Sequence, residues 1–515
     1  MTAALQAPLP LLYCGSHAYC STPQRHTAAL FIRLCDRACR AAGPALRMGS
    51  RPFGEESMQI NEAKSAELVA RLETLPFSKW HRNFFILGFL GVMFDAADFA
   101  LFGAALPPIA REFGLGPAQA GLMATVGLVG AFVGALFWGT VSDYIGRRTS
   151  FSATIGIFAL FTGLVATSWN VASLAVFRFL SNFGLGGEVP VTATLGAEFS
   201  PGRIRGAMAG NMLTAFPVGL IVAAALSLTI LPTFGWRGLF AVGIVPAVLL
   251  FFVRRYMPES VRYLLSKGRI AEAEQTVAEI ERQALGRERT SDELKAVPKV
   301  HPEVAVKTGV TVLELFTQGR ARQTILIWIV SFGFFWSSNG ILFMLPTILT
   351  QQGIPLSQAI AYQLVQAIGG VLGYTACSFW IDRYGRRPVL FLYYFVGAFF
   401  HLWFAMSSGF TTFIAAFLVG WVNPGVYGST GVYVGELHPT HIRATAVGWF
   451  FGIGRIGSFL VPTVVGIMIA YGLGKYTLYM FAVSFFIASL ALLAIGIETK
   501  GRILEEITEA KPAAA

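Results

Sequence analysis

Gly139-Thr-Val-Ser-Asp143-Tyr-Ile-Gly146-Arg147-Arg148 and Ser378-Phe-Trp-Ile-Asp382-Arg-Tyr-Gly385-Arg386-Arg387 are two versions of one short motif, and each joins two long apolar segments. Their aspartates lie 239 residues apart. A second pair of segments, Glu198 to Arg205 and Glu436 to Arg443, repeats at a spacing of 238 residues. One half of the chain therefore repeats the other, a pattern typical of rocking membrane transporters whose site lies between two similar bundles.

The composition is that of a membrane protein. Charged residues make up only 13% of the chain and hydrophobic residues 55%, far from the composition of soluble domains. A helix that crosses the hydrocarbon core needs roughly 20 apolar residues, and twelve such runs follow from Phe84 onward. We expect an all-α membrane protein with twelve transmembrane helices in two six-helix, pseudo-symmetric bundles. The predicted spans are 84–110, 118–141, 149–167, 171–199, 207–231, 236–256, 324–350, 357–381, 389–406, 411–435, 444–470 and 476–496.

The basic residues of the short loops predict the orientation, because lysine and arginine gather on the cytoplasmic side of membrane proteins. One face carries Arg147, Arg148, Arg203, Arg205, Arg383, Arg386, Arg387 and Arg443. The other face carries Arg111, Arg237 and Lys475. We therefore expect a multi-pass protein of a bacterial inner (plasma) membrane with both termini in the cytoplasm. The net charge of +11 follows from this topology and does not predict binding to nucleic acid.

The chain divides into six regions. They are an N-terminal extension 1–57, a cytoplasmic lead-in 58–83, an N-terminal bundle 84–256, a central loop with short helices 257–322, a C-terminal bundle 323–497 and a tail 498–515. The extension holds Cys14, Cys20, Cys35 and Cys39. A translation start placed too far upstream is the favoured interpretation, because Met58 opens an amphipathic lead-in; a transit peptide and a zinc site are alternatives. The cysteines lack the short spacing of structural zinc ligands, so we expect neither a metal nor a cofactor.

Several motifs together carry a resemblance to a known family. They are the two loop motifs, the two Glu-to-Arg segments, Pro258-Glu259-Ser260-Val-Arg262 after the sixth span, and Glu498-Thr-Lys500-Gly501-Arg502 after the twelfth. From about Lys79 to Ile507 the chain resembles proteins of the major facilitator superfamily. The similar branch contains sugar porters, synaptic vesicle protein 2-like proteins and proton symporters for organic acids.

The loop motifs match the gate of that family. A carboxylate at a helix end can pair with arginines of the next loop and accept N–H groups from a helix start. The resemblance implies gating roles for Asp143, Arg147, Asp382 and Arg386, and we extend them to Arg148, Arg387, Glu198, Glu436, Arg205 and Arg443. Alternatively, the arginines only fix the topology.

Few ionisable residues fall within the predicted spans, and a charge at bilayer depth costs about 2.5–3.5 kcal/mol on insertion scales. The first span carries Asp95 and Asp98, and the fourth carries Arg178 and Glu188. Asp95 and Asp98 are three residues apart, so they share one helix face. We predict that the carboxyl groups of Asp95, Asp98 and Glu188 bind the coupling proton and that contact with Arg178 modulates its release. The alternatives are that Asp95 or Asp98 caps a broken helix or pairs permanently with Arg178, or that Glu188 only joins two helices.

Arg455 in the eleventh span lies in a glycine-rich stretch and lacks a partner on its own helix. A substrate carboxylate could complete its bidentate pairing, or Arg455 could form a salt bridge with one of the buried carboxylates. His401 in the ninth span is interpreted as a lipid-headgroup or packing residue.

Three segments are similar to those of proton symporters for aromatic acids and nicotinate-type carriers: Asp95-Ala-Ala-Asp98, Gly184-Leu-Gly-Gly-Glu-Val-Pro190 and Gly454-Arg455-Ile-Gly457. The paired glutamines of sugar porters are absent from the seventh span, which reads Phe335-Trp-Ser-Ser-Asn339. An aromatic-lined cavity with few polar groups suits a flat ring better than a polyol. The candidate substrate-binding residues, besides Arg455, are Phe99, Phe102, Phe216, Trp336, Asn339, Phe343 and Trp421.

The fifth span bears on export. Drug antiporters of this superfamily carry glycine before the proline there, whereas this chain has Phe216 before Pro217. This difference makes drug export a weaker alternative.

We predict a monomeric, proton-coupled symporter in the lipid bilayer that imports a small organic anion, such as a benzoate or nicotinate relative. The alternatives are sugar symport, drug or metabolite efflux, and a non-transporting sensor. We find no nucleotide-binding loop and no arrangement of a nucleophile in the sequence, so we do not predict an enzyme.

Overall fold

The computed structural model describes residues 64–201, 212, 214–290, 293, 312–317 and 319–500. These residues fall within one unit, Ala63–Ala515. The predicted extension 1–57, Arg203, Arg205 and the tail beyond residue 500 lie outside the described residues.

The first three helices of the N-terminal bundle are continuous, whereas the fourth span is broken at a glycine. The first three spans are α3 (Lys79–Glu112), α4 (Pro117–Ile145) and α5 (Arg147–Val165). The fourth, which the sequence predicts as one helix, is two: α6 (Val171–Gly186) and α7 (Glu188–Phe199). They part at Gly187, where a Cβ atom would lie 2.4 Å from the Trp138 side chain of α4. The break therefore coincides with a close approach between helices that only glycine allows.

The fifth and sixth spans are also divided differently from the prediction. Helix α9 (Ala215–Val242) continues past the predicted end of the fifth span, but Gly235 within it has φ of 65° and ψ of −170°, which is not helical. The sixth span then consists of the end of α9 and of α10 (Pro246–Tyr256). Glycine supplies this kink because a positive φ costs it little.

The C-terminal bundle repeats this plan in α14 (Ala321–Gln351), α15 (Leu356–Tyr384), α16 (Arg386–Met406), α17 (Phe410–Glu436), α18 (Thr440–Ala470) and α19 (Thr477–Ile495). The repeat extends to backbone angles. Gly146 before α5 has φ of 97°, and Gly385 before α16 has φ of 109°. The two loop motifs therefore make the same sharp turn between successive helices.

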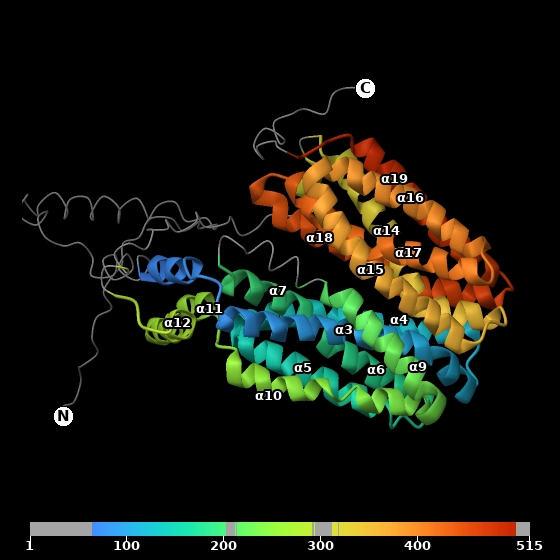
Figure 1. The fold of residues 1–515 in the computed structure, drawn as a ribbon, viewed down its shortest axis with the longest axis horizontal. Helices are drawn as coiled ribbons and strands as arrows, with labels where there is room; N and C mark the ends of the chain where they lie inside the picture. Colours follow the sequence, from blue (N-terminus) through green and yellow to red (C-terminus); the bar gives the residue numbers. More distant parts are fainter. Residues whose placement is uncertain are drawn as a thin grey trace, which may run out of the picture. The chain divides into compact units, whose positions relative to one another are not determined.

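Ten helices of the described chain are long and apolar enough to cross a membrane, and one of them, Ala215–Tyr256, holds the fifth and sixth spans. The shorter apolar helix Val171–Gly186, continued by α7, supplies the fourth. The predicted all-α fold of twelve spans is confirmed. In Figure 1 the N-terminal helices, blue to lime, form one group, and the C-terminal helices, yellow to red, form the other.

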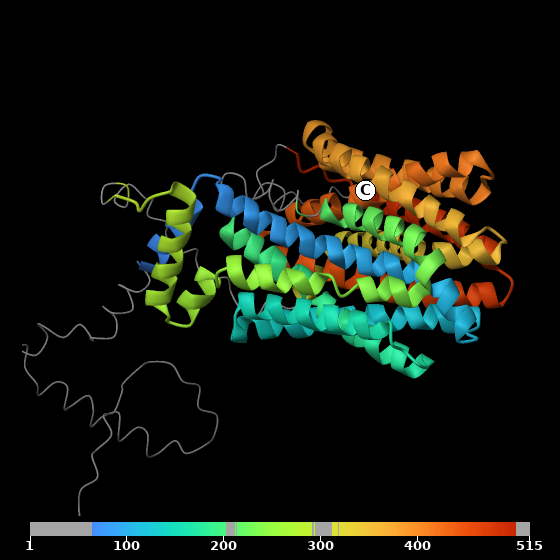
Figure 2. The same cartoon turned by 60° about the horizontal axis from the view of Figure 1, so that its bottom comes forward.

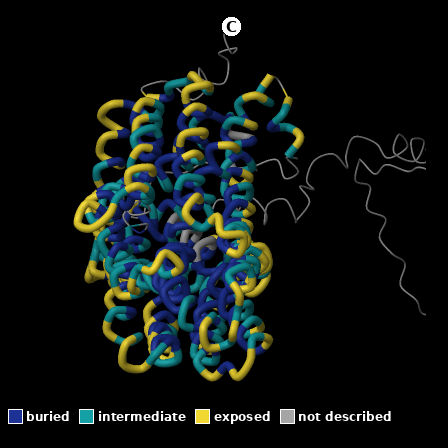
Figure 3. Tube along the Cα trace, turned by 90° about the vertical axis from the view of Figure 1, so that its right-hand side faces the viewer, coloured by how far each residue is buried: buried dark blue, intermediate teal, exposed yellow. Residues whose placement is uncertain are grey.

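Among the described residues, the two bundles share a hydrophobic core at one end. That core combines α3 residues such as Leu106 with α14 residues such as Ile348 and α18 residues such as Val465. Toward the loops that carry Asp143 and Asp382, each bundle has a core of its own. Figure 3 shows the buried residues along the inner helix faces and the exposed ones on the outer turns. We call the end with the loop motifs the motif end and the other the closed end.

The contact between α4 and α18 shows the same asymmetry. At the closed end, a Cβ atom on Gly121 would lie 2.2 Å from the Pro462 carbonyl oxygen. Further along, Thr125 donates a hydrogen bond to the Phe459 carbonyl at 2.7 Å. Toward the motif end, a Cβ atom on Gly139 or on Gly448 would have no atom within 4 Å. For the residues that the structure describes, α4 and α18 are therefore in close contact at one end and not at these two positions toward the motif end.

A small helical layer packs on the motif end of the N-terminal bundle (Figure 2). It consists of a helical segment 64–73, α11 (Val261–Ser266) and α12 (Ile270–Leu285). Glu281 is 2% exposed and binds Arg71 at 2.5 Å and Arg289 at 3.1 Å. In the C-terminal half, the 3-10 helix η2 (Val312–Phe316) precedes α14, and η3 (Gly474–Tyr476) precedes α19.

Candidate functional site

Asp98 and Arg178 form a buried ion pair inside the N-terminal bundle. The Arg178 Nη1 atom lies 2.7 Å from Asp98 Oδ2, and their side chains are 1% and 2% exposed. The Arg178 guanidinium also stacks 4.3 Å from the centre of the Phe102 ring. Thr162 donates a long hydrogen bond of 3.4 Å to Asp98 Oδ1. The two charges are thus compensated within one bundle, as a buried pair requires.

Asp95 lies one helical turn from Gly91 and faces a different partner. Its carboxyl group is 2% exposed and lies within hydrogen-bonding reach of Glu188, which is 1% exposed. A Cβ atom on Gly91 would lie 2.1 Å from Glu188 Oε1, so glycine makes room for this carboxyl group. Neither Asp95 oxygen finds a hydrogen-bond donor among the described residues. Two adjacent carboxyl groups can bond to each other only when one is protonated.

Arg455 is the charged group of α18 that faces this pair. It is half-buried, it lies within electrostatic reach of Asp95 and Tyr427, and it forms no ion pair with a carboxylate of the described chain. The alternative of a permanent salt bridge therefore does not hold in this conformation.

Tyr427, the aromatic neighbour of Arg455, belongs to a cluster of three rings. The ring centre of Tyr427 lies 5.8 Å from that of Phe335 and 5.7 Å from that of Phe451. The Phe335 and Phe451 centres are 6.3 Å apart. The sequence prediction missed these three residues, because nothing in a chain with 13% aromatic residues distinguishes them until helices α14, α17 and α18 meet.

Phe99 of the first span and Phe343 of the seventh, two predicted lining residues, meet between the two bundles. Phe99 contacts Phe343 edge-on, with ring centres 5.5 Å apart. Trp336 stacks on Phe332 at 5.3 Å. Asn339 donates a hydrogen bond to Ser458 Oγ at 3.0 Å, which ties α14 to α18.

The other predicted lining residues lie in packed surroundings. Phe102 is 1% exposed beneath Arg178. Phe216 packs in a small cluster with Val92. Trp421 packs against Trp380, with ring centres 6.5 Å apart, inside the C-terminal bundle.

His401 is a buried residue that packs against Phe485, with ring centres 4.5 Å apart, which agrees with the packing interpretation and contradicts the lipid-headgroup one. Its side chain is 2% exposed, and Nδ1 lies 2.7 Å from the Gly397 carbonyl oxygen. Nε2 lies 3.1 Å from Ser337 Oγ and 3.4 Å from Asn423 Nδ2. Because Nδ1 donates to a carbonyl, Nε2 is the acceptor of this network.

The loop motif of the N-terminal bundle is held by an ion pair within the motif and by hydrogen bonds to the segment that follows the bundle. Arg147 Nη1 lies 2.6 Å from Asp143 Oδ1. The backbone N–H groups of Arg147 and Arg148 donate to Glu259 Oε1 at 2.7 and 3.1 Å. The Arg148 side chain donates to the Arg254 carbonyl oxygen. Glu198 lies near Ser260 and Arg147 in the same cluster.

The second loop motif repeats these contacts. Arg386 lies 3.4 Å from Asp382 and donates to both oxygens of Glu436, with Nε 3.1 Å from Oε2. The backbone N–H groups of Arg386 and Arg387 donate to Glu498 at 2.9 and 3.0 Å. Arg387 Nη2 donates to the Leu493 carbonyl at 3.0 Å. Arg443 is described and has interaction partners, whereas Arg205 lies outside the described residues.

Glu259 and Glu498 were missing from the predicted gate. Each accepts the first N–H groups of a helix, α5 or α16, where the helix dipole favours a negative charge. A signal was present in the sequence, since these two glutamates are 239 residues apart, the same spacing as the motif aspartates.

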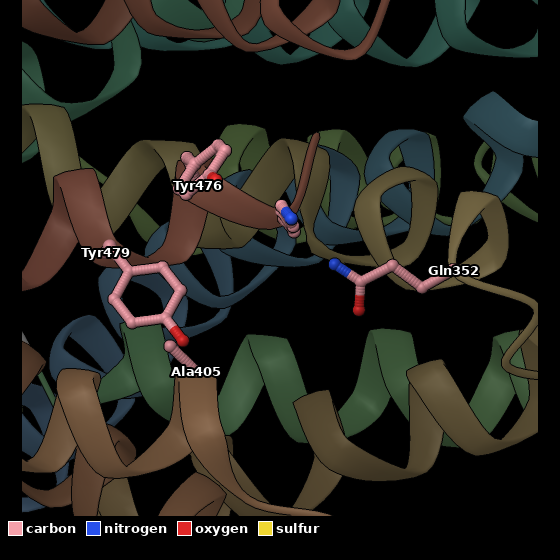
Figure 4. A pocket seen from close by; sticks show the side chains of 5 residues that line it. Gln352, Ala405, Tyr476 and Tyr479 are labelled. Carbon is pink, nitrogen blue, oxygen red and sulfur yellow. The ribbon is translucent and has the colours of Figure 1, made fainter. Parts of the chain in front are cut away.

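A separate cavity of about 300 Å³ lies at the closed end of the C-terminal bundle (Figure 4). It is lined by Gln352, Ala405, Lys475, Tyr476 and Tyr479. None of these is a predicted site residue, and the cavity is distinct from the cluster of buried charges.

Comparisons with known proteins agree with this architecture. Residues 89–510 match the family model described as "Sugar (and other) transporter". The chain is 32% identical to the niacin transporter of Acinetobacter baylyi over 86% of this chain and 99% of that protein. It is 30% identical to the 4-hydroxybenzoate transporter of the same organism, over 77% and 87%.

The fold is shared with a solved structure of a sugar carrier. The inward-open conformation of the xylose transporter XylE from E. coli superposes with a TM-score of 0.66 at 19% identity, over 82% of this chain and 98% of that one. XylE is a major facilitator superfamily protein. The family match covers most of the chain, and the predicted resemblance is confirmed. The chain belongs to the sugar (and other) transporter family and is a multi-pass membrane transporter of the major facilitator fold.

Proposed function

We propose that this transporter is a proton-coupled symporter that imports a small aromatic carboxylate, such as a relative of nicotinate or benzoate. The observation that carries the proposal is Arg455, a guanidinium without a carboxylate partner in the described chain, whose neighbour Tyr427 belongs to the ring cluster of Phe335, Tyr427 and Phe451. An aromatic carboxylate matches both features, since its charge pairs with arginine and its ring with aromatic side chains. The relatives named for niacin and 4-hydroxybenzoate transport support this class of substrate.

The proton enters the proposal through the buried carboxyl pair of α3 and α7. Asp95 and Glu188 are almost completely buried, and Asp95 has no donor among the described residues. A carboxyl group in such surroundings can bind and release a proton as its neighbours change. Asp98 and Arg178 would hold the charge balance of the bundle.

The orientation completes the proposal. The arginines of the loop motifs indicate that the motif end faces the cytoplasm. In this proposal the described conformation is the one open to the cytoplasm, and the two motif clusters are parts of the gate. We propose that the carrier works as a monomer in a bacterial inner membrane.

The test is uptake by the purified protein in proteoliposomes with an inward proton gradient. Labelled nicotinate, benzoate and 4-hydroxybenzoate are compared with the neutral amides nicotinamide and benzamide and with xylose. We expect gradient-driven accumulation of carboxylates only. Accumulation of xylose, or export of cationic compounds, would overturn the proposal in favour of sugar symport or efflux.

Arg455→Ala, with Arg455→Lys beside it, tests the assigned carboxylate site. Because a charge-assisted hydrogen bond contributes roughly 1.5–3 kcal/mol, we expect Arg455→Ala to raise the KM for nicotinate by about 10- to 100-fold. Binding of the neutral amide should change little. Arg255→Ala, at an exposed position of α10, is the matched control. An equal loss for the acid and the amide would show that Arg455 has a structural role only.

A further inference from the structure

Asp95 and Glu188 raise a question that the symport proposal leaves open, namely how many protons cross with each substrate. We infer that Asp95 and Glu188 share one resident proton in the empty carrier and take up a second proton only when a carboxylate occupies Arg455. One proton is then transported with each monoanion, and the transport cycle moves no net charge. This inference rests on the proposed function.

The geometry of the pair supports a resident proton. Asp95 is 2% exposed, Glu188 is 1% exposed, and the two carboxyl groups lie within hydrogen-bonding reach. Among the described residues, both Asp95 oxygens and Glu188 Oε1 lack a hydrogen-bond donor. Two carboxylates that are buried side by side, away from a bound cation, repel each other strongly. A shared proton removes one charge and supplies the missing hydrogen bond.

The other charges near the pair are few and can be counted. Asp98 is neutralised by Arg178 at 2.7 Å within the same bundle. Arg455 on α18 is the cation that faces Asp95 from the other bundle. The charged residues of the described helices packed around α3 lie toward helix ends or junctions. They are Asp143 of α4, Glu198 of α7, Arg237 of α9, Arg254 and Arg255 of α10, Arg322 of α14, and Asp382 and Arg383 of α15. Helix α12, which packs at the motif end, carries Glu272, Glu274, Glu279, Glu281 and Arg282.

The remaining charged residues of α3 itself are also far from Asp95. Lys79, His81 and Arg82 precede Asp95 by 13 residues or more, and Arg111 and Glu112 follow it by 16 or more. At about 1.5 Å per residue these groups lie roughly 20 Å away along the helix. The local balance is therefore set by the carboxyl pair, by Arg455 and by whatever binds Arg455.

The balance gives the stoichiometry. In the empty carrier, a pair with one proton has a charge of −1, and Arg455 has +1, so the site is neutral. A bound monoanion adds −1 at Arg455. The site returns to neutrality when one more proton joins the pair, which is then fully protonated. In both the empty and the fully loaded carrier, the bundles can close around a neutral site of low dielectric constant. A bound anion without the second proton would leave an uncompensated charge in that site.

The same charge balance disfavours the movement of a proton or a substrate alone across the membrane. A proton that binds without substrate leaves Arg455 buried without a counter-charge, and a substrate that binds without a proton leaves one negative charge in excess. Each of these half-loaded forms carries one uncompensated charge when the bundles close, so neither is expected to cross readily.

The first test separates the pH gradient from the membrane potential in proteoliposomes, with nicotinate as substrate and the potential clamped by potassium and valinomycin. With one proton per monoanion, a gradient of one pH unit supports about tenfold accumulation. A potential of 100 mV, negative inside, should add nothing. If two protons cross, the same potential raises accumulation by roughly 50-fold, and a transport current appears on a solid-supported membrane. Either result would overturn the inference while leaving the proposed function intact.

The second test counts protons on binding. In weakly buffered detergent solution, wild-type protein should take up about one proton per nicotinate bound. The double variant Asp95→Asn/Glu188→Gln keeps a neutral pair, so it should bind nicotinate independently of pH and take up no proton. Retained binding shows that the variant is folded. Proton uptake by the double variant would refute the assignment, and a failure of wild-type protein to accumulate any aromatic acid would instead refute the proposed function.

Discussion

The absence of a Cβ atom at Gly91 leaves the space in which the Glu188 carboxyl group lies. Any larger side chain at this position would overlap Glu188 Oε1, because a Cβ atom would lie 2.1 Å away. The neighbouring aspartates then take separate partners. Three residues of an α-helix turn about 300°, which leaves roughly 60° between Asp95 and Asp98. This angle directs one carboxyl group to Glu188 and the other to Arg178.

Gly91→Ala tests this arrangement at the scale of one atom. The added methyl group forces Glu188 away from its position, so we expect at least a tenfold loss of proton-driven nicotinate accumulation. Gly156→Ala on α5 is the matched control, since its Cβ atom would have its nearest neighbour at 3.9 Å. It should transport normally and gain a little helix stability. Normal accumulation by Gly91→Ala would show that the position of Glu188 is not needed for coupling.

At the scale of elements, the starts of α5 and α16 are built alike. The first N–H groups of a helix lack partners within the helix, and here Glu259 and Glu498 accept them from a distant part of the chain. These glutamates lie in the segments that follow the last helix of each bundle. They therefore connect the end of each bundle to its loop motif.

Glu259→Ala should loosen the start of α5. A lost capping interaction costs about 1 kcal/mol, so amide exchange at residues 147–150 should become roughly fivefold faster. The measurement is hydrogen–deuterium exchange by mass spectrometry in detergent. Glu288→Ala, at a side chain that is 77% exposed, is the control. Unchanged exchange at α5 would contradict the capping role.

The helical layer at the motif end depends on one buried carboxylate. Glu281 holds Arg71 of the lead-in segment and Arg289 after α12. Glu281→Gln removes the charge and leaves two partly buried arginines without it, so we expect a loss of roughly 3 kcal/mol in the stability of this layer. A lower melting temperature and faster tryptic cleavage of the lead-in would report it. Glu279→Gln, at a side chain that is 52% exposed, should have little effect.

At the scale of the whole molecule, the shared core at the closed end and the separate cores at the motif end define one conformation of a two-state carrier. The tight contact of Gly121 with Pro462 belongs to that conformation. For the proposed uptake, the α4–α18 contact must open at this end and the bundles must approach at the other.

Gly121→Trp should prevent the two bundles from meeting at the closed end. The ring cannot fit where a Cβ atom already lies 2.2 Å from the Pro462 carbonyl, so the carrier should remain open at that end. We expect transport to fall by at least 100-fold while nicotinate binding persists. Leu122→Trp is the control, because this neighbouring side chain is 54% exposed. Retained transport by Gly121→Trp would show that this contact does not define the state.

Much of the candidate site could be predicted from the sequence. The charged residues at membrane depth are few, so Asp95, Asp98, Arg178, Glu188 and Arg455 stand out by composition alone. Their pairing could not be predicted, because it depends on the rotation of each helix. The ring cluster of Phe335, Tyr427 and Phe451 was equally hidden, since aromatic residues occur on every helix.

The sequence by itself determined the repeat, the twelve spans and the two loop motifs, because these depend on local hydrophobicity and on fixed spacings along the chain. Only the tertiary structure decided that Asp98 pairs with Arg178, that Asp95 meets Glu188 beside Gly91, and that Arg455 forms no ion pair with a described carboxylate. It also decided which end of the bundles is closed. These features depend on how helices distant in sequence rotate and approach, and glycines at the contacts set how close that approach can be.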